Sequence, residues 1–237
     1  QQFIFDLLAG LDPPKAAAVV ALDPRSGAVR ALVNYPSFDP NAFSQPALRD
    51  RAQGYSDDDR QPLFNRAVGG TYPPGSTIKP FIGASILEEN LISPYKKIFA
   101  PGSISIYNQY NPEIVYTFRD WKEHGWVNMI DAIAYSSNVY FYTFGGGYEE
   151  VKGLGIEIIT DYLKKFHFGE TLGIDLANEA SGLIPSPEWK EIIKNEQWYT
   201  GDTYNTSIGQ GDMTITPLQL VTAISYLANT GQWYKPH

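Results

Sequence analysis

Two residues in the stretch GGTYPPGSTIKP, residues 69–80, have side chains suited to nucleophilic catalysis. Ser76 and Lys79 are three positions apart, a spacing that puts two side chains on one face of a helix. A serine hydroxyl becomes a good nucleophile when a base removes its proton. A lysine can be that base if burial or a neighbouring cation lowers its pKa. The spacing therefore indicates a serine nucleophile with a lysine base.

The same stretch can also be compared with a phosphate-binding loop. From Gly70 it reads G-x-x-x-x-G-S-T, which differs from the nucleotide-binding pattern in having Ser76 where the lysine belongs. Such a loop binds phosphate through successive backbone N–H groups and that lysine. Pro73 and Pro74 remove two N–H groups, and no apolar strand leads into the loop. The nucleophile is therefore the better interpretation.

Ser-x-x-Lys is a weak motif by itself, since about one match per chain arises by chance. A second match, Ser93-Pro94-Tyr95-Lys96, has the composition of an exposed turn. Ser76 differs because Pro-Pro-Gly precedes it and a long apolar helix is predicted to follow it, to about residue 90.

A second pair of polar residues, Ser136 and Asn138, lies in the segment AYSSNVYFY. A hydroxyl at Ser136 can pass a proton between nucleophile, lysine and leaving group. The amide of Asn138 can bind both Lys79 and a substrate peptide group. The alternative is an ordinary polar break between two helices.

The composition excludes several classes of function. The chain has 237 residues, enough for one large domain or two small ones, and 43% of them are hydrophobic. Its net charge is -8 and the sequence has no dense run of Lys and Arg, so nucleic-acid binding is not expected. The absence of cysteine excludes disulfides, thiol catalysis and cysteine-ligated metals. No run of about 18 apolar residues is present. The first and last residues read as cut ends, and we expect a fragment.

The elements that must position these residues follow from the pattern of the sequence. Strands are predicted at 17–22 and 28–33 around a turn at 23–27. Helical segments are predicted at 128–144, with a break at YSSN, and at 149–166. A last helix starts at Pro217, with Thr216 as N-cap and Gln219 completing a capping box. Residues 36–62 read as loop with one short helix, residues 94–127 as irregular with some β character, and residues 170–210 as a long irregular stretch rich in Gly, Pro and Trp. Strands followed by helices predict an α+β fold.

Together these motifs resemble those of the penicillin-binding transpeptidases. The segments PLFNRAVGGTYPPGSTIKP, FRDWKEHGWVN, GIDLANEASGLIPSPEWK and GDTYNTSIGQGDMTITPLQL resemble the elongation-type class B enzymes of that family. The resemblance covers nearly the whole chain. It implies a penicillin-binding/serine β-lactamase-like fold, of which residues 1–237 would be part of the transpeptidase domain: the helical subdomain and the first strands of an antiparallel sheet.

The resemblance also implies a function. Ser76 would attack a peptidoglycan stem peptide, Lys79 would accept its proton, and Ser136 and Asn138 would complete the catalytic set. Stem peptides and β-lactams would bind without a cofactor. A glycosyltransferase and other elongation proteins would be partners. The catalytic domain would lie on the periplasmic side of the inner membrane, attached through an N-terminal anchor absent from this chain.

One departure from the family pattern concerns the third motif, Lys-Thr/Ser-Gly, which the sequence lacks. Asn229-Thr230-Gly231 is a decoy with the composition of a helix end. In the family the real motif follows further along the chain and binds the substrate carboxylate. We therefore expect little transpeptidase activity, and poor folding, from this fragment alone. Gly209-Gln210-Gly211 is better read as a tight turn than as a wall of the site.

Asp120 and His124 raise the possibility of a metal site, because some relatives bind zinc there with Asp, His and Cys ligands. Two ligands fall short of the four that a structural zinc requires, and no cysteine completes them. We therefore predict no metal, and a structural role for Asp120 with Arg119 in polar packing.

Two alternatives use the same fold. A D-Ala-D-Ala carboxypeptidase or serine β-lactamase would pass the acyl group to water. A β-lactam sensor domain would be acylated once and signal. The elongation-type segments favour the transpeptidase over both.

Overall fold

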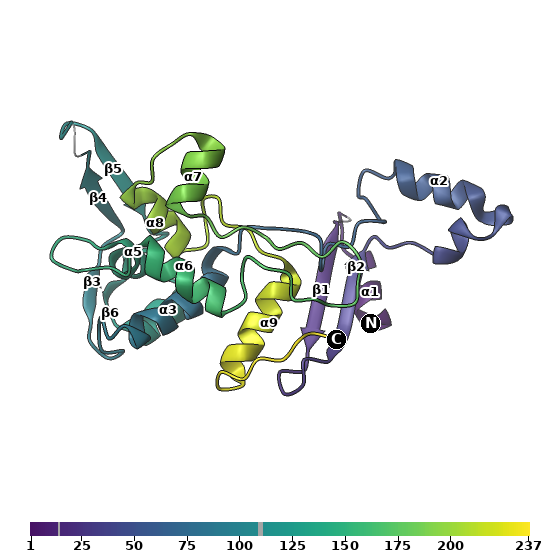
Figure 1. The fold of residues 1–237 in the computed structure, drawn as a ribbon, viewed down its shortest axis with the longest axis horizontal. Helices are drawn as coiled ribbons and strands as arrows, with labels where there is room; N and C mark the ends of the chain where they lie inside the picture. Colours follow the sequence, from purple (N-terminus) through teal and green to yellow (C-terminus); the bar gives the residue numbers. More distant parts are fainter. Residues whose placement is uncertain (14, 109–110) are drawn as a thin grey trace. The chain divides into compact units, whose positions relative to one another are not determined.

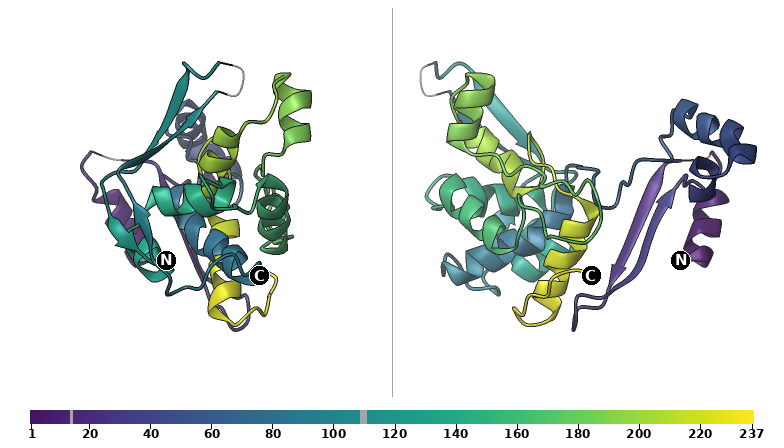
Figure 2. Two further views of the ribbon diagram at one scale, coloured as in Figure 1. Left: turned by 90° about the vertical axis from the view of Figure 1, so that its left-hand side faces the viewer. Right: turned by 45° about the vertical axis from the view of Figure 1, so that its right-hand side comes forward.

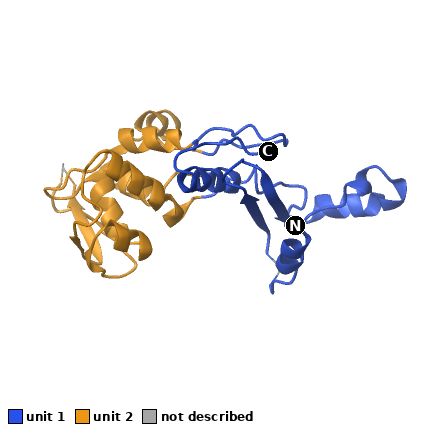
Figure 3. Cartoon of the chain, turned by 90° about the horizontal axis from the view of Figure 1, so that it is seen from below, with its two compact units in different colours: residues 1–72, 167–182, 215–237 blue, residues 73–166, 183–214 orange. Residues whose placement is uncertain are grey.

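The computed structural model describes residues 1–13, 15–108 and 111–237, which form two compact units (Figure 3). Unit 1 comprises residues 1–72, 167–182 and 215–237, and unit 2 comprises residues 73–166 and 183–214. Each unit combines segments that are far apart in the sequence.

Unit 1 is built around an antiparallel hairpin. Strands β1 and β2 pair with Ala17 opposite Tyr35, and the turn between them closes where the Gly27 N–H donates to the Asp23 carbonyl. Both strands were predicted, although the second starts one residue later than expected. The elements of unit 1 are α1 (Gln2–Ala9), β1 (Ala17–Leu22), β2 (Val29–Tyr35), the 3-10 turns η1 (Pro40–Phe43) and η2 (Pro46–Leu48), α2 (Arg49–Asp57) and α9 (Pro217–Ala228).

Helix α9 packs beside β1 (Figure 1). Its Leu218 is fully buried in a core that also contains Val68 and Leu172. The predicted capping box is confirmed, because Thr216 Oγ1 accepts from the Gln219 N–H at 3.0 Å and Gln219 Oε1 accepts from the Thr216 N–H at 2.9 Å.

Unit 2 contains the segment around Ser76 and Lys79. Its strands pair antiparallel, β3 with β6 and β4 with β5. With the hairpin of unit 1, every sheet in the described residues is an antiparallel pair, which confirms the predicted α+β class. The elements are η3 (Gly75–Ile78), α3 (Lys79–Glu88), β3 (Ile98–Ala100), β4 (Ser103–Tyr107), β5 (Val115–Arg119), β6 (Gly125–Val127), α4 (Met129–Ala134), α5 (Asn138–Gly146), α6 (Ile156–Lys165), α7 (Pro187–Lys194) and α8 (Thr200–Ser207).

Helix α5 forms the centre of unit 2. Residues 139–145 of this helix are all buried, as expected for a sequence that is apolar on every side. Helices α3, α4, α6 and α8 pack around it (Figures 1 and 2). Ile78, Ile82 and Ile86, spaced four residues apart after Ser76, are fully buried.

The structure differs from the sequence prediction in two places. The helix predicted at 149–166 begins only at Ile156, because Gly155 at φ 78° starts a new direction of the backbone. Helices α7 and α8 lie in a segment predicted as irregular. Ser186 and Pro187 begin α7 with the same N-cap and N1 signals that identified α9. Within the described residues, every helix is too short or too polar to cross a bilayer.

Candidate active site

The turn that carries Ser76 is held by backbone geometry. Pro73 and Pro74 restrict the chain before Gly75, which adopts a left-handed φ of 56°. The turn η3 then leads into α3, so Ser76 lies on the 3-10 turn and Lys79 at the first position of the α-helix. Ser76 is exposed, whereas Lys79 is only 1% exposed. The nucleophile candidate therefore faces solvent and the base candidate is buried.

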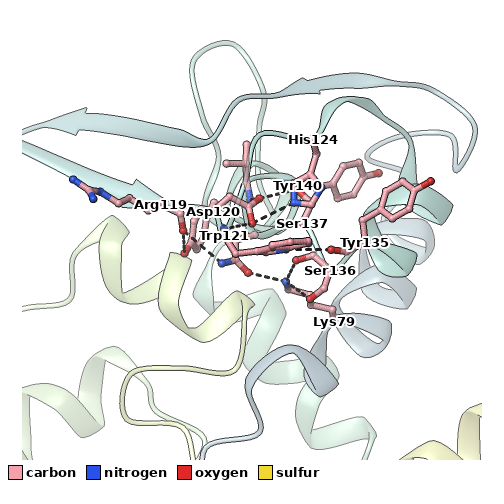
Figure 4. Close-up of polar contacts among 12 residues, drawn as sticks. Lys79, Arg119, Asp120, Trp121, His124, Tyr135, Ser136, Ser137 and Tyr140 are labelled. Carbon is pink, nitrogen blue, oxygen red and sulfur yellow. Dashed lines mark hydrogen bonds and ion pairs between the residues drawn. The ribbon is translucent and has the colours of Figure 1, made fainter.

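The ammonium of Lys79 contacts three oxygens of the Ser136–Asn138 turn (Figure 4). Its Nζ donates to the Ser136 carbonyl at 2.8 Å, to Ser136 Oγ at 3.1 Å and to Asn138 Oδ1 at 2.7 Å. The structure thus brings together three of the four predicted site residues, although Lys79 lies almost sixty positions before Ser136 and Asn138. Ser76 lies three residues before Lys79 on the adjoining turn.

Burial changes the protonation of this lysine. Desolvation lowers the pKa of Lys79 from its usual 10.5 to about 8, while the negative charge of Asp120 opposes part of that shift. A lysine with this pKa has a substantial neutral fraction in mildly alkaline solution, and the neutral amine can accept a proton.

The break predicted at YSSN is the junction between α4 and α5. Ser136 has a left-handed φ of 56°, which reverses the chain after α4. Ser137 then caps α5 by accepting from the Tyr140 N–H at 3.4 Å. The turn places Ser136 and Asn138 on either side of a buried cap, so both can face Lys79.

Asp120 supports this turn from the other side. Its Oδ2 accepts from Ser137 Oγ and from the Val139 N–H, both at 2.9 Å (Figure 4). His124 Nε2 lies 3.5 Å from Asp120 Oδ1, and neither side chain is accessible to solvent. Asp120 therefore takes part in polar packing, as predicted. The described residues contain no group of three or more His, Cys, Asp or Glu side chains able to hold a metal ion.

Arg119 contributes through its backbone instead of its guanidinium. Its carbonyl accepts from Asn138 Nδ2 at 3.5 Å and from the Tyr142 hydroxyl at 3.3 Å. Figure 4 shows the Arg119 side chain directed away from Lys79. The predicted polar packing of Arg119 thus involves its main chain, which binds Asn138 and Tyr142, a contact that side-chain types do not reveal.

Gly209 contacts the turn that carries the nucleophile candidate. The Gly75 N–H donates to the Gly209 carbonyl at 2.9 Å. Gly209 has a φ of 71°, and a Cβ built on it would lie 2.3 Å from the Gly75 carbonyl oxygen. Residues 209–211 were predicted to form a tight turn, and the left-handed backbone of Gly209 and Gly211 fits that prediction. The turn also packs against Gly75, the residue before Ser76.

The two segments that only resemble family motifs, residues 93–96 and 229–231, have ordinary structures. Ser93 and Lys96 form an exposed turn in which the Lys96 N–H donates to the Ser93 carbonyl at 3.0 Å. Asn229–Gly231 ends α9, with the Gly231 N–H bonded to the Tyr226 carbonyl at 3.0 Å. Ser76, Lys79, Asp120, Ser136, Asn138 and Gly209 all belong to unit 2, so the site is contained in one compact unit.

Comparison with known proteins identifies the family. The profile described as "Penicillin binding protein transpeptidase domain" matches residues 17–237. The chain is 40% identical over 225 residues to the peptidoglycan D,D-transpeptidase MrdA of Acinetobacter baumannii, covering 94% of this chain and 32% of MrdA. It thus spans about a third of the length of that curated relative.

Solved structures agree. Penicillin-binding protein 2 (PBP2) of Pseudomonas aeruginosa, in complex with WCK 5153, matches with a TM-score of 0.86 and 36% identity, over 98% of this chain and 48% of that one. PBP2 of Helicobacter pylori, in a complex with MreC, matches with a TM-score of 0.83 and 36% identity, over 94% of this chain and 39% of that one. The expected fold and the resemblance to elongation-type class B enzymes are therefore confirmed. The chain belongs to the penicillin-binding protein transpeptidase domain family.

Proposed function

We propose that this chain is the part of a peptidoglycan D,D-transpeptidase domain that carries the serine nucleophile, and that the protein crosslinks stem peptides during cell-wall elongation. The observation that carries the proposal is the buried Lys79, held by Ser136 and Asn138, one helical turn after the exposed Ser76. Its similarity to MrdA and PBP2 supports the same reaction.

In the acylation step, Ser76 Oγ attacks the carbonyl carbon of the penultimate D-Ala, and its proton passes to the neutral Lys79 Nζ. The start of the helix after Ser76 offers N–H groups and a positive dipole end to the developing oxyanion. The C–N bond to the terminal D-Ala then breaks, and the leaving nitrogen takes a proton through Ser136 Oγ. An ester on Ser76 and free D-Ala result.

In the second step, an amine of a neighbouring stem peptide attacks the ester. The amine loses a proton, Ser76 Oγ regains one, and a new amide joins the two stems. Asn138 is suited to bind the substrate peptide next to Lys79, because its amide already bridges Lys79 and the Arg119 carbonyl. β-Lactams would be trapped at the same serine, because their strained amide resembles the substrate's.

The partners and the location follow from the relatives and remain part of the proposal. The MreC complex of H. pylori PBP2 supports elongation proteins as partners. The similarity to a peptidoglycan synthase complex that coordinates polymerization and crosslinking supports a glycosyltransferase as a further partner. A domain that acts on peptidoglycan stem peptides would lie on the periplasmic side of the inner membrane. No cofactor is required for the two steps.

The nucleophile can be tested with labelled penicillin and intact-protein mass spectrometry on the full-length protein that contains this chain. We expect one penicillin adduct on the wild type, none on Ser76→Ala, and an undiminished adduct on Ser93→Ala, the matched serine of the exposed turn. An adduct that survives in Ser76→Ala would refute the assignment.

A second assay separates the transpeptidase from its alternatives. A pentapeptide donor ending in D-Ala-D-Ala is mixed with an acceptor peptide that has a free amine. Crosslinked product supports the proposal. Release of D-Ala without crosslinking would indicate a carboxypeptidase, and stable acylation by penicillin without turnover of either peptide would indicate a sensor.

A further inference from the structure

A cavity of about 520 Å³ lies in unit 2, between the β4–β5 hairpin and the start of α8. We call it the hairpin groove. Five of its lining residues are aromatic: Tyr107 at the end of β4, Tyr116 and Phe118 on β5, and Trp198 and Tyr199 just before α8. None of these residues is used in the proposed acyl transfer.

The hairpin groove adjoins the candidate active site. Phe118 precedes Arg119, whose carbonyl accepts from Asn138 Nδ2 at 3.5 Å. The rings of Phe118 and Tyr204 pack edge to face, with their centroids 4.9 Å apart. The Phe118 ring also lies against Gly201, where an added Cβ would be 2.7 Å from the ring. The end of β5 thus contributes both to the groove, through Phe118, and to the candidate active site, through the Arg119 carbonyl.

The aromatic rings of the groove are accessible. Tyr107 is 69% exposed, Tyr199 54% and Tyr116 47%. Tyrosine combines a flat apolar face with a hydroxyl at low cost in conformational entropy, so it suits ligands that are apolar on one face and polar at the edge. The side chains of Thr200 and Asn205 add hydrogen-bonding groups to the lining.

The charges of the groove favour a neutral ligand. Asp202 is the charged side chain among the described lining residues, and it is already bound to Lys190 Nζ at 2.8 Å and to the Tyr199 N–H at 2.8 Å. Lysine and arginine are absent from that described lining. The cation beside this lining, Lys190, is buried, already paired with Asp202, and 5.4 Å from the centre of the Tyr199 ring. A peptide with free carboxylates would therefore find no unpaired cation among the described lining residues, whereas an N-acetylated sugar has no charge, an apolar ring face and several hydroxyl groups.

We propose that the hairpin groove binds N-acetylated sugar residues of the glycan strand that carries the substrate peptide. This inference rests on the proposed function, because the sugars belong to the same peptidoglycan substrate whose stem peptide binds at Ser76. The aromatic faces stack on the sugar rings, and Thr200 and Asn205 bind their polar edges.

The test uses chitotetraose, a neutral chain of four N-acetylglucosamine units, and isothermal titration calorimetry on the full-length protein. We expect saturable binding that weakens at least tenfold in Tyr107→Ala and in Tyr199→Ala. Tyr95→Ala is the matched control, because Tyr95 is 74% exposed and lies outside the groove. Thermal melting shows whether each variant is folded. Absence of saturable binding to the wild type, or equal binding by wild type and both groove variants, would overturn the proposal.

Two further measurements keep the proposals separable. Penicillin acylation is measured on the same samples. If acylation fails while chitotetraose still binds in a groove-dependent way, the proposed function fails and the sugar site stands. If acylation is normal and chitotetraose does not bind, only the sugar site fails. Tighter groove-dependent binding of a sugar-free acidic pentapeptide than of chitotetraose would overturn the assignment to sugar.

Discussion

At the residue scale, the proposed acyl transfer depends on the buried amine of Lys79. Its pKa of about 8 results from two opposed effects, desolvation that lowers it and the negative charge of Asp120 that raises it. In the proposed mechanism the neutral amine is the base, so the midpoint of the pH profile of acylation reports the Lys79 pKa that results from both effects.

We predict that the rate of penicillin acylation rises about tenfold per pH unit below pH 8 and levels off above it. The sign follows because raising the pH through the Lys79 pKa converts the ammonium into the base. A rate measured from pH 5 to 10 with labelled penicillin checks this. A rate that falls as the pH rises from 6 to 8 would exclude a neutral lysine as base.

Asp120→Asn is expected to move the midpoint of that profile to lower pH, because it removes the charge that raises the Lys79 pKa. Glu123→Gln, an exposed carboxylate in the same loop, is the matched control and should leave the midpoint in place. A purely structural defect in Asp120→Asn would lower the plateau without moving the midpoint, so the profile distinguishes the two roles.

At the scale of elements, the candidate site consists of two turns, and each turn is held in place by a contact of a serine or a glycine. The turn before α3 presents Ser76, and the junction of α4 and α5 presents Ser136 and Asn138. Asp120 fixes the second turn through Ser137. Gly209 fixes the first through the Gly75 backbone.

Gly209→Ala should therefore reduce acylation by roughly 10- to 100-fold, since a shift of about 1 Å in reacting groups has effects of that size. The added Cβ would meet the Gly75 carbonyl oxygen in a left-handed residue, so we also expect a loss of about 1–3 kcal/mol in the free energy of unfolding. Penicillin kinetics and urea denaturation measure the two effects.

Gly54→Ala is the control for this substitution. Gly54 lies in helix α2, has open space around it and a backbone that alanine can adopt. We expect unchanged acylation and a gain of about 0.5–1 kcal/mol. Equal acylation by the Gly209 and Gly54 variants would show that the Gly209 contact does not position Ser76.

At the scale of the whole molecule, the described residues form two units whose segments alternate along the sequence, and the candidate site is contained in unit 2. The chain passes between the two units more than once along its sequence. The Lys-Thr/Ser-Gly motif, which by resemblance binds the substrate carboxylate and completes the oxyanion hole, is absent from the sequence.

We predict that the 237-residue chain, expressed by itself, is acylated by penicillin at least about 100-fold more slowly than the full-length protein, because loss of an oxyanion-hole donor has effects of 10²–10³. Circular dichroism establishes whether the chain is folded. Acylation of the isolated chain at the full-length rate would show that the third motif is dispensable for this step.

Local signals were sufficient for much of this protein. The hairpin of β1 and β2, the helix after Ser76, the break at YSSN and the capping box at Thr216 were predictable, because each depends on residues within a few positions of one another. The Ser76, Lys79, Ser136 and Asn138 set was also predicted, through the resemblance. Helix α7 was missed although Ser186 and Pro187 carry its start signal.

Other contacts between distant segments could not be predicted. The contact of Lys79 with Asn138 was anticipated from the motifs, but the support of the turn by Asp120 and the packing of Gly209 on Gly75 were not, and these join residues from 17 to more than 130 positions apart. The lowered pKa of Lys79 has the same origin, because desolvation depends on what surrounds the amine. Residue types and short spacings carry the chemistry that is possible, whereas burial and long-range packing decide which groups meet and in which protonation state.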